Sequence, residues 1–264
     1  MIQDLQCISK KLRLRSRKLR LDLVAMLFSI NELVKHWRIS PKSVLHIGAH
    51  LAEECDLYRS VGWNKVIWIE ANPELINDLR EKVEPLGHRV YEAAVWNTTG
   101  EEVSLRVASN GQSSSLFEFN KHSTYYPKIV VDKEIVIKTQ RVDSILISSE
   151  TPDFCNLDIQ GAELAALEGL GEYINKLNAI YTEVNKVELY RGCALIDDID
   201  DFLGKAGFKR VATRWMLGFG WGDALYQRQG HNVLHRLKGI HYPIYFYLRQ
   251  LPSVLSRLFS KFTH

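Results

Sequence analysis

Apolar residues in the first part of the chain recur at the spacing of an amphipathic helix. Between residues 4 and 37 they return at steps of three, four and seven, as at Leu23, Met26 and Ile30. This periodicity predicts one long helix over 4–37. Ser40-Pro41 ends it, because the residue before a proline is sterically excluded from the helical conformation.

Beyond Pro41 short apolar runs alternate with helical stretches, which is typical of a parallel sheet wound with helices on both faces. The last two apolar runs are too close together for a crossover helix, so we expect them to pair as an antiparallel hairpin. The predicted strands are 43–47, 65–70, 89–95, 102–108, 134–140, 153–158, 179–184, 208–214 and 223–228, and the predicted helices are 50–61, 74–84, 161–170 and 195–206.

The end of the chain carries an apolar helical stripe from Ile240 to Phe262 that is broken at Pro243 and Pro252. Such a stripe fits a helix lying in a membrane interface. It fits equally well a segment that packs on the body of the chain or on a second copy. We therefore expect a basic amphipathic helical arm over 1–40, a central domain over 41–228 and a basic amphipathic tail over 229–264.

The net charge of +3 on 264 residues is unevenly distributed. Residues 1–22 contain seven basic and two acidic residues, and 229–264 contain five basic residues and no acid, which leaves −7 for the residues between them. Two basic ends on an acidic body indicate an anionic partner, either lipid headgroups or nucleic acid. Solvated helix faces are the alternative. The apolar content of 46% and charged content of 25% are those of a globular protein, which excludes a disordered chain.

The cysteines and the apolar segments bear on the compartment. The stretch at 23–30 is far shorter than the ~20 residues that a membrane span needs. Asp22 interrupts the signal-peptide pattern, and Asn31-Glu32 stands where small cleavage-site residues would be expected. We expect a cytoplasmic protein, peripheral at the inner face of the membrane if its ends bind lipid. The isolated cysteines, without any C-x-x-C, fit a reducing compartment; they are Cys7, Cys55, Cys155 and Cys193.

The carboxyl ends of the predicted strands carry the candidate cofactor site, since ligands of open α/β sheets bind there. Gly48 follows the first strand and allows a ligand to approach the backbone closely. Glu70 ends the second strand, where a ribose diol would need an acceptor. Together they predict a nucleoside-cofactor site. The candidate cofactor-binding residues are Gly48, Ala49, His50, Glu70, Ala71, Asn72, Ala94 and Asp158.

Five motifs in chain order resemble the FkbM-type S-adenosylmethionine-dependent methyltransferases over about residues 41–228. They are Val44-Leu-His-Ile-Gly-Ala-His50, Trp68-Ile-Glu-Ala-Asn-Pro73, Val142-Asp-Ser144, Asn156-Leu-Asp-Ile-Gln-Gly-Ala-Glu163 and Tyr181-Thr-Glu-Val-Asn185. The resemblance implies a Rossmann-like, class I fold. Its sheet would be doubly wound, mostly parallel and seven-stranded, with a terminal antiparallel hairpin and helical extensions at both ends. S-adenosylmethionine would be its cofactor.

The chain departs from the family pattern at three places. His46 stands where the family has an aspartate on the first strand, and Asn156 where it usually has a lysine two residues before the fourth-strand acid. Leu51-Ala52 occupies the position of the second glycine. The backbone turn at Gly48 and the Glu70 carboxylate remain, so the resemblance still implies cofactor binding. A catalytic lysine cannot be carried over.

The implied reaction is methyl transfer to a hydroxyl, which needs positioning and help in removing a proton. Asp158 and Glu183 end adjacent predicted strands and are the first candidates for that help, with His50 as the third catalytic candidate. Asp158, Glu183 and Asp223 could converge on a divalent ion, but we expect no metal. The candidate substrate-binding residues, from strand ends and from two motifs that resemble the glycan-associated branch of the family, are Gln112, Ser113, Ser114, Gln160, Asn185, Trp221 and Asp223.

The leading hypothesis is therefore an O-methyltransferase that acts on a sugar hydroxyl of a glycan or of a lipid-linked saccharide. A methyltransferase for another small hydroxylated metabolite is the alternative within the enzyme class. A non-catalytic scaffold or nucleic-acid-binding protein that kept the fold is the alternative outside it. Carboxylates gathered at strand ends argue against nucleic acid as the partner. A homo-oligomer is compatible with the apolar tail.

Overall fold

The structure is a computed structural model that describes residues 26–230, so most of the predicted arm and tail lies outside the described residues. Within the described part, the expected helix over 4–37 is wrong at residues 26–29, which are not helical, and the helix α2 spans only Ile30–Lys35. Ser29 begins α2 as its N-cap and forms a capping box with Glu32. This S-x-x-E signature marks a helix start that the apolar periodicity hides.

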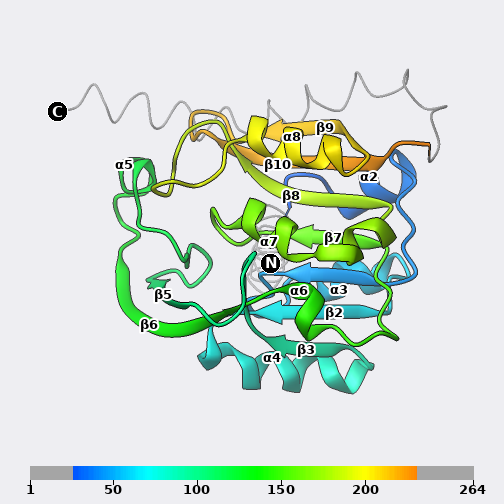
Figure 1. The fold of residues 1–264 in the computed structure, drawn as a ribbon, viewed down its shortest axis with the longest axis horizontal. Coiled ribbons are helices and arrows are strands. Elements are labelled where there is room, and N and C mark those ends of the chain that lie inside the picture. The colour runs from blue at the N-terminus through cyan, green and yellow to red at the C-terminus, as the bar shows by residue number, and fades with distance from the viewer. Residues whose placement is uncertain (1–25, 231–264) are drawn as a thin grey trace, which may run out of the picture.

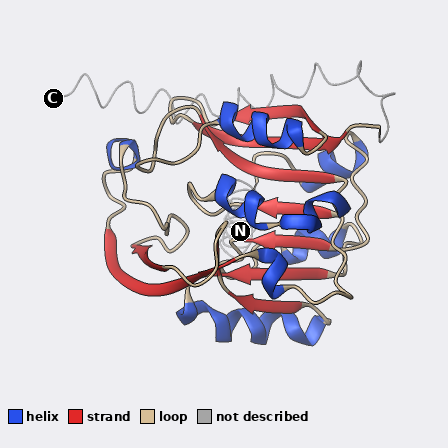
Figure 2. Ribbon diagram, viewed as in Figure 1, coloured by secondary structure: helices blue, strands red, loops and turns tan. Residues whose placement is uncertain are grey.

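The main sheet has seven strands in the order β3-β2-β1-β7-β8-β10-β9, which confirms the predicted sheet and its terminal hairpin (Figures 1 and 2). Strands β3, β2, β1, β7 and β8 run parallel, whereas β10 is antiparallel to both β8 and β9. The strands are β1 (Val44–Ile47), β2 (Val66–Glu70), β3 (Arg89–Glu92), β7 (Phe154–Leu157), β8 (Ala179–Asn185), β9 (Phe208–Trp215) and β10 (Trp221–Arg228).

Helices cover both faces of the sheet, and the strands read as continuous apolar runs because both of their faces are buried. In β1, Leu45 and Ile47 pack under α6 (Val142–Ile145), α7 (Glu163–Gly169) and α8 (Ile196–Lys205), which lie in front of the sheet in Figure 1. On the opposite face Val44 packs with α2, α3 (Cys55–Ser60) and α4 (Ile76–Val83). The short 3-10 helices are Pro73–Leu75, Glu84–Leu86 and Gly171–Lys176.

A second sheet of three strands lies beyond the carboxyl ends of the parallel strands (Figure 1). It contains β4 (Ala94–Val95), β5 (Glu102–Ala108) and β6 (Val131–Gln140), and the helix α5 (Lys121–Tyr125) lies on the same side. The single strand predicted over 89–95 is therefore wrong. The chain leaves the main sheet at Ala93, whose N–H still bonds to the Glu70 carbonyl, and β4 then pairs with β6.

The helix predicted over 50–61 is also shorter than expected. Residues before Cys55 form a tight turn in which His50 and Ala52 adopt left-handed backbone conformations (φ 44° and 49°). This turn forms part of the edge where the site lies. Within residues 26–230 no helix is long and apolar enough to cross a bilayer.

Candidate active site

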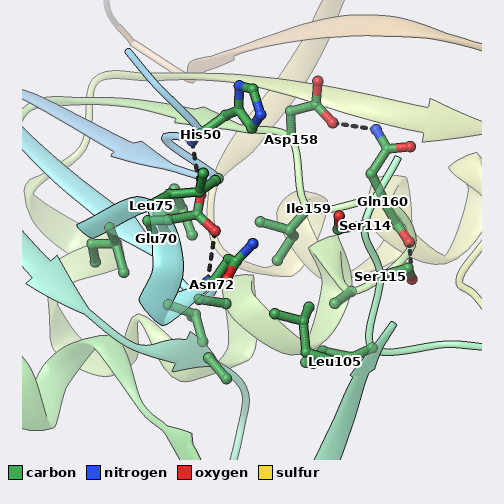
Figure 3. Close-up of a pocket in the computed structure, with 18 of the residues that line it drawn as sticks. His50, Glu70, Asn72, Leu75, Leu105, Ser114, Ser115, Asp158, Ile159 and Gln160 are labelled. Atoms are coloured by element: carbon green, nitrogen blue, oxygen red, sulfur yellow. Dashed lines mark hydrogen bonds between the residues drawn. The ribbon is translucent and has the colours of Figure 1, made fainter. Parts of the chain in front are cut away.

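Two adjoining cavities open at the carboxyl edge of the main sheet. The first lies over the ends of β1, β2 and β4 and is closed by residues 111–116 (Figure 3). The second extends from the ends of β7, β8 and β10 to α3 and to the loop around residue 190. Their common wall consists of Gly48, His50, Gln112, Asp158 and Gln160. A ligand in one cavity would therefore lie next to a ligand in the other.

Gly48 holds the ends of β1 and β7 close together. Its φ of +88° is in the left-handed region, and a Cβ atom there would lie 1.9 Å from the carbonyl oxygen of Asp158. The Asp158 N–H in turn donates to the Ile47 carbonyl at 3.1 Å. Only glycine fits this crossing, because any other side chain would push the two strand ends apart.

Glu70 organises the floor of the first cavity. Its carboxylate accepts the backbone N–H of His50 at 2.7 Å and that of Asn72 at 2.8 Å, and so ties the loops after β1 and β2 together (Figure 3). Burial raises the pKa of Glu70, although these N–H donors oppose the shift. Each carboxylate oxygen can accept two hydrogen bonds, so both oxygens retain acceptor capacity for a ribose diol.

His50 joins the turn after β1 to the segment that closes the first cavity. Its Nδ1 lies 2.6 Å from Glu53 Oε1, and this hydrogen bond raises the pKa of His50. Its Nε2 faces Gly111, where a Cβ atom would lie only 2.8 Å away. The imidazole is thus held by Glu53 on one side and covered by the 111–116 segment on the other.

Gln160 holds the two candidate catalytic carboxylates. Its amide nitrogen donates to Asp158 Oδ1 at 2.6 Å and to Glu183 Oε2 at 3.1 Å, while its amide oxygen accepts the Tyr190 hydroxyl. The backbone carbonyl of Gln160 also accepts a hydrogen bond from the Ser115 hydroxyl at 2.6 Å (Figure 3). Both amide protons are used within the protein, so Gln160 positions Asp158 and Glu183 from its own left-handed conformation (φ 54°).

The carboxylates around this junction carry perturbed pKa values. Asp158 is open to the cavities but surrounded by protein, and desolvation raises its pKa. Burial, with the charges of Asp158 and Glu163 in addition, raises the pKa of Glu183 well above its ordinary value. Burial also raises the pKa of Glu163 and of Asp223 to about 7 each. Glu163 and Asp223, with pKa values of about 7, can exchange protons near neutral pH.

Oxygen atoms of Asp158, Glu163 and Glu183 lie within 4.8 Å of one another, a spacing that a cation could bridge. Glu163, however, already accepts the backbone N–H groups of Ile159 and Gly161. It therefore supports the loop after β7. No salt bridge among residues 26–230 neutralises any of these three carboxylates.

His46 and Asn156, two of the residues that depart from the family pattern, lie side by side in the structure. His46 and Asn156 are partners in the register of β1 and β7. The Asn156 amide nitrogen donates to the Tyr58 hydroxyl at 2.7 Å and lies 3.4 Å from His46 Nδ1. Burial lowers the pKa of His46 to about 3, so its imidazole is neutral. A neutral hydrogen-bonded trio of His46, Tyr58 and Asn156 thus includes the two positions where the family pattern has an aspartate and a lysine.

Most of the residues predicted for the cofactor line the first cavity. Ala49 does not: it packs in the hydrophobic core. Asn185 lines neither cavity and is fully buried, and its side-chain amide has no hydrogen-bond partner among the described residues. The first cavity contains Gly48, His50, Glu70, Ala71, Asn72, Ala94, Gln112, Ser114, Asp158 and Gln160, and the second contains His50, Gln112, Ser113, Asp158, Gln160, Glu183, Trp221 and Asp223.

Several residues of the second cavity had not been identified from the sequence. Glu54 is only 8% exposed, and burial raises its pKa to about 8. The acidic pair Glu53-Glu54 beside the first strand was the available signal. Tyr181 and Tyr190 also line this cavity, together with Met26 and Leu27 from the start of the described chain. Nothing local in the sequence marks these four as neighbours.

Comparison with known proteins identifies a family that this chain matches. The family described as "Methyltransferase FkbM domain" matches residues 46–210. The curated 2-O-methyltransferase NoeI of Sinorhizobium fredii is 30% identical over 156 residues, which cover 53% of this chain and 63% of NoeI. The match therefore spans less than two thirds of that relative.

Solved structures with a similar arrangement are remote in sequence. Magnesium protoporphyrin IX methyltransferase from Synechocystis, with bound S-adenosylmethionine, is 10% identical with a TM-score of 0.46, and the match covers 80% of this chain and 79% of that one. A methyltransferase from Clostridium acetobutylicum is 9% identical with a TM-score of 0.46, covering 85% of this chain and 100% of that one. The family match and the strand-end site lead to one conclusion: the chain belongs to the FkbM family of S-adenosylmethionine-dependent methyltransferases.

Proposed function

We propose that this protein transfers a methyl group from S-adenosylmethionine to a hydroxyl of a saccharide, either a glycan or a lipid-linked saccharide. The observation that carries the proposal is the junction of the two cavities, where Gln160 holds Asp158 and Glu183. The first cavity is the cofactor site in this proposal and the second is the acceptor site.

The first cavity fits the cofactor. Glu70 offers acceptor oxygens for the ribose diol, and Gly48 lets the backbone come close to the ligand. Asp158, on the common wall, supplies negative charge for a cationic ligand, and no lysine or arginine lines the first cavity within residues 26–230. Bound there, S-adenosylmethionine supplies an electrophilic methyl group on a positively charged sulfur.

The protein's own contribution to the reaction is positioning and proton removal. The acceptor oxygen forms its bond to the methyl carbon while the carbon–sulfur bond breaks, and the hydroxyl proton passes to a carboxylate. Asp158 and Glu183 are suited to take it, since both line the second cavity and burial raises the pKa of each, which makes each a stronger base than an exposed carboxylate. Gln160 keeps the two groups in place and leaves one oxygen of each outside its own hydrogen bonds.

Aromatic side chains support a saccharide as the acceptor. Trp221, Tyr126 and Tyr190 line the second cavity, and Trp221 Nε1 donates to the Tyr126 hydroxyl at 2.9 Å. Such rings combine an apolar face for the C–H surface of a sugar with polar edges. The relative NoeI is named a 2-O-methyltransferase, which supports transfer to an oxygen.

The decisive experiment combines cofactor binding with acceptor screening. Calorimetry should detect binding of S-adenosylmethionine, and radiolabelled cofactor should then methylate at least one of a panel of methyl glycosides. Transfer to other hydroxylated metabolites, with none to any glycoside, would favour the metabolite alternative. A folded protein that fails to bind the cofactor would leave only the scaffold alternative.

The basic ends suggest where the acceptor is presented. Residues 229–264 carry five basic residues and no acid, and each such charge near an anionic lipid surface contributes about 1 kcal/mol. We therefore propose attachment to an anionic membrane surface. A chain truncated after Arg228 should lose sedimentation with anionic vesicles, and binding by the full chain should weaken with salt. A full chain that ignores these vesicles at low salt would instead give the tail a packing or oligomerisation role.

A further inference from the structure

We refer to the four residues before α2, Met26–Ser29, as the strap; its first two residues line the second cavity. Met26 and Leu27 are among the residues that line this cavity, and neither lines the first. Leu27 and Phe28 are nevertheless largely buried, at 8% and 2% exposure. The strap is therefore a fixed part of the wall of the second cavity.

The main chain of the strap is held by hydrogen bonds from three strands. The Leu27 N–H donates to Asp223 Oδ2 on β10 at 2.7 Å, and the Phe28 N–H donates to the Tyr181 hydroxyl on β8 at 3.2 Å. Arg214 on β9 donates to the Leu27 carbonyl at 3.0 Å. Tyr181 also donates to Asp223, so these groups form one network.

A buried ion pair fixes the same network to α2. Arg214 donates with both terminal nitrogens to the Glu32 carboxylate, and the side chains of the pair are only 9% and 12% exposed. The Arg214 guanidinium also lies over the Phe28 ring at 4.3 Å, and that ring packs edge-on against Tyr181. A bidentate pair of this kind fixes direction as well as distance.

The atoms that anchor the strap are mostly different from those that face the second cavity. The protein holds the strap through backbone groups and the Phe28 ring. Leu27 and Met26, which also packs against the hydrophobic core, then contribute to the wall of the cavity. All the anchors except Tyr181 lie outside the matched family region of 46–210. The strap and three of its four anchors, Glu32, Arg214 and Asp223, thus lie outside the matched region, whereas Tyr181 lies inside it.

The geometry points to the strap as the specificity-determining wall of the acceptor site, with Arg214 and Asp223 as positioning residues that act through it. The inference rests on the proposed function, because it takes the second cavity as the acceptor site. None of Leu27, Arg214 and Asp223 lines the first cavity. Loosening the strap should therefore impair acceptor recognition and leave cofactor binding intact.

The test uses the full chain with Arg214→Gln and Leu27→Ala. In Arg214→Gln the amides of Leu27 and Phe28 should exchange hydrogen roughly tenfold faster or more, since the strap loses a charge-assisted hydrogen bond to the Leu27 carbonyl. The KM for the best glycoside of the panel should rise by a similar factor. The Kd for S-adenosylhomocysteine should stay within about twofold. Leu27→Ala should enlarge the cavity and change the ranking of bulky against small glycosides.

Arg210→Gln is the matched control, because Arg210 lies on the same strand but pairs with Asp200 of α8 at 2.8 Å, away from the strap. Arg210→Gln should change neither the hydrogen exchange of the strap nor the acceptor KM. Arg214→Lys should have an acceptor KM between those of the wild type and Arg214→Gln. Faster strap exchange with an unchanged acceptor KM would overturn the inference. So would an equal loss of acceptor and cofactor affinity. If the wild type methylates no glycoside, the proposed function itself fails, and this inference falls with it.

Discussion

The two cavities are built in different ways, although they share a wall. The polar floor of the first comes from neighbouring strand ends: Glu70 receives N–H groups from residues 20 and 2 positions away. The second is closed by contacts across almost the whole domain, such as Leu27 with Asp223, 196 positions apart. The cofactor end thus follows from local turns of the fold, whereas the acceptor end needs the completed domain.

The buried carboxylates of the two cavities also differ in what surrounds them. Glu70 in the first cavity is supported by backbone N–H donors. In the second, Glu54 lies 3.9 Å from His46, which burial keeps neutral, and the charge of Lys82 opposes the rise of the Glu54 pKa only in part. Buried carboxylates without a cationic partner are costly to ionise. The ionised form of Glu54 is therefore disfavoured, and its pKa rises to about 8.

The largest effect should come from disturbing the turn that both cavities share. We expect Gly48→Ala to destabilise the domain by roughly 4 kcal/mol or more and to abolish cofactor binding, because the new methyl group would meet the Asp158 carbonyl in a left-handed backbone. Gly87→Ala is the control, with a similar φ of +82° and nothing within 4 Å, and should cost only about 1 kcal/mol. Denaturant unfolding and calorimetry measure both. Equal losses would show that the close approach at Gly48 is unimportant.

The next effect concerns pH and is confined to the second cavity. The pKa of Glu54 is raised in the folded state, so the stability it contributes is fully present below about pH 4.5 and is lost as pH rises through about 8. Glu54→Gln should remove roughly 2–4 kcal/mol of the wild type's loss of stability between pH 5 and pH 8. Glu163, Glu183 and Asp223 act in the same direction, so some slope remains.

Urea unfolding at pH 5, 6.5 and 8 checks this prediction. The exposed Glu84, which pairs with Arg80 on α4, provides the control variant Glu84→Gln, with an unchanged slope. A Glu54→Gln protein as pH-sensitive as the wild type would mean that Glu54 is ionised in the folded state.

Substitutions at the junction of the cavities should lower the rate of methyl transfer more than they lower cofactor affinity. We expect Asp158→Asn or Glu183→Gln, or both, to lower the single-turnover rate by about 10²-fold, which is within the usual contribution of a general base. Cofactor affinity should change much less in Glu183→Gln, since Glu183 does not line the first cavity and Glu70, Gly48 and Asp158 are untouched. If both variants react within a few-fold of the wild type, the proton leaves to His50 or to water instead.

The smallest of these effects belongs to the first cavity alone. Glu70→Ala should weaken binding of S-adenosylmethionine by about 1.5–3 kcal/mol, the contribution of charge-assisted hydrogen bonds. Titration calorimetry measures this, and thermal unfolding verifies that the variant is folded. A folded variant with an unchanged Kd would exclude Glu70 as the ribose acceptor.

The sequence predicted the main sheet well because its strands are continuous apolar runs separated by helical stretches. The prediction from apolar periodicity failed at Ser29, where a capping box begins a new helix. It also failed at Ala93, where one apolar run is divided between two sheets. Most residues of the first cavity could be predicted because strand ends are recognisable in sequence and the carboxyl ends of parallel strands meet at one edge of the sheet. The strap was not recognisable, since its contacts depend on residues nearly 200 positions away.

The Glu32–Arg214 pair has a consequence for the order of folding. Glu32 both completes the capping box that begins α2 and receives Arg214 from 182 positions later. A contact of such long range closes a very large loop and forms late. The first element of the described domain is therefore among the last to dock, after β9 and β10 have been synthesised and paired. We expect Phe28 and Tyr181 to lack their mutual contact until then, and exposed apolar surface of this kind favours aggregation.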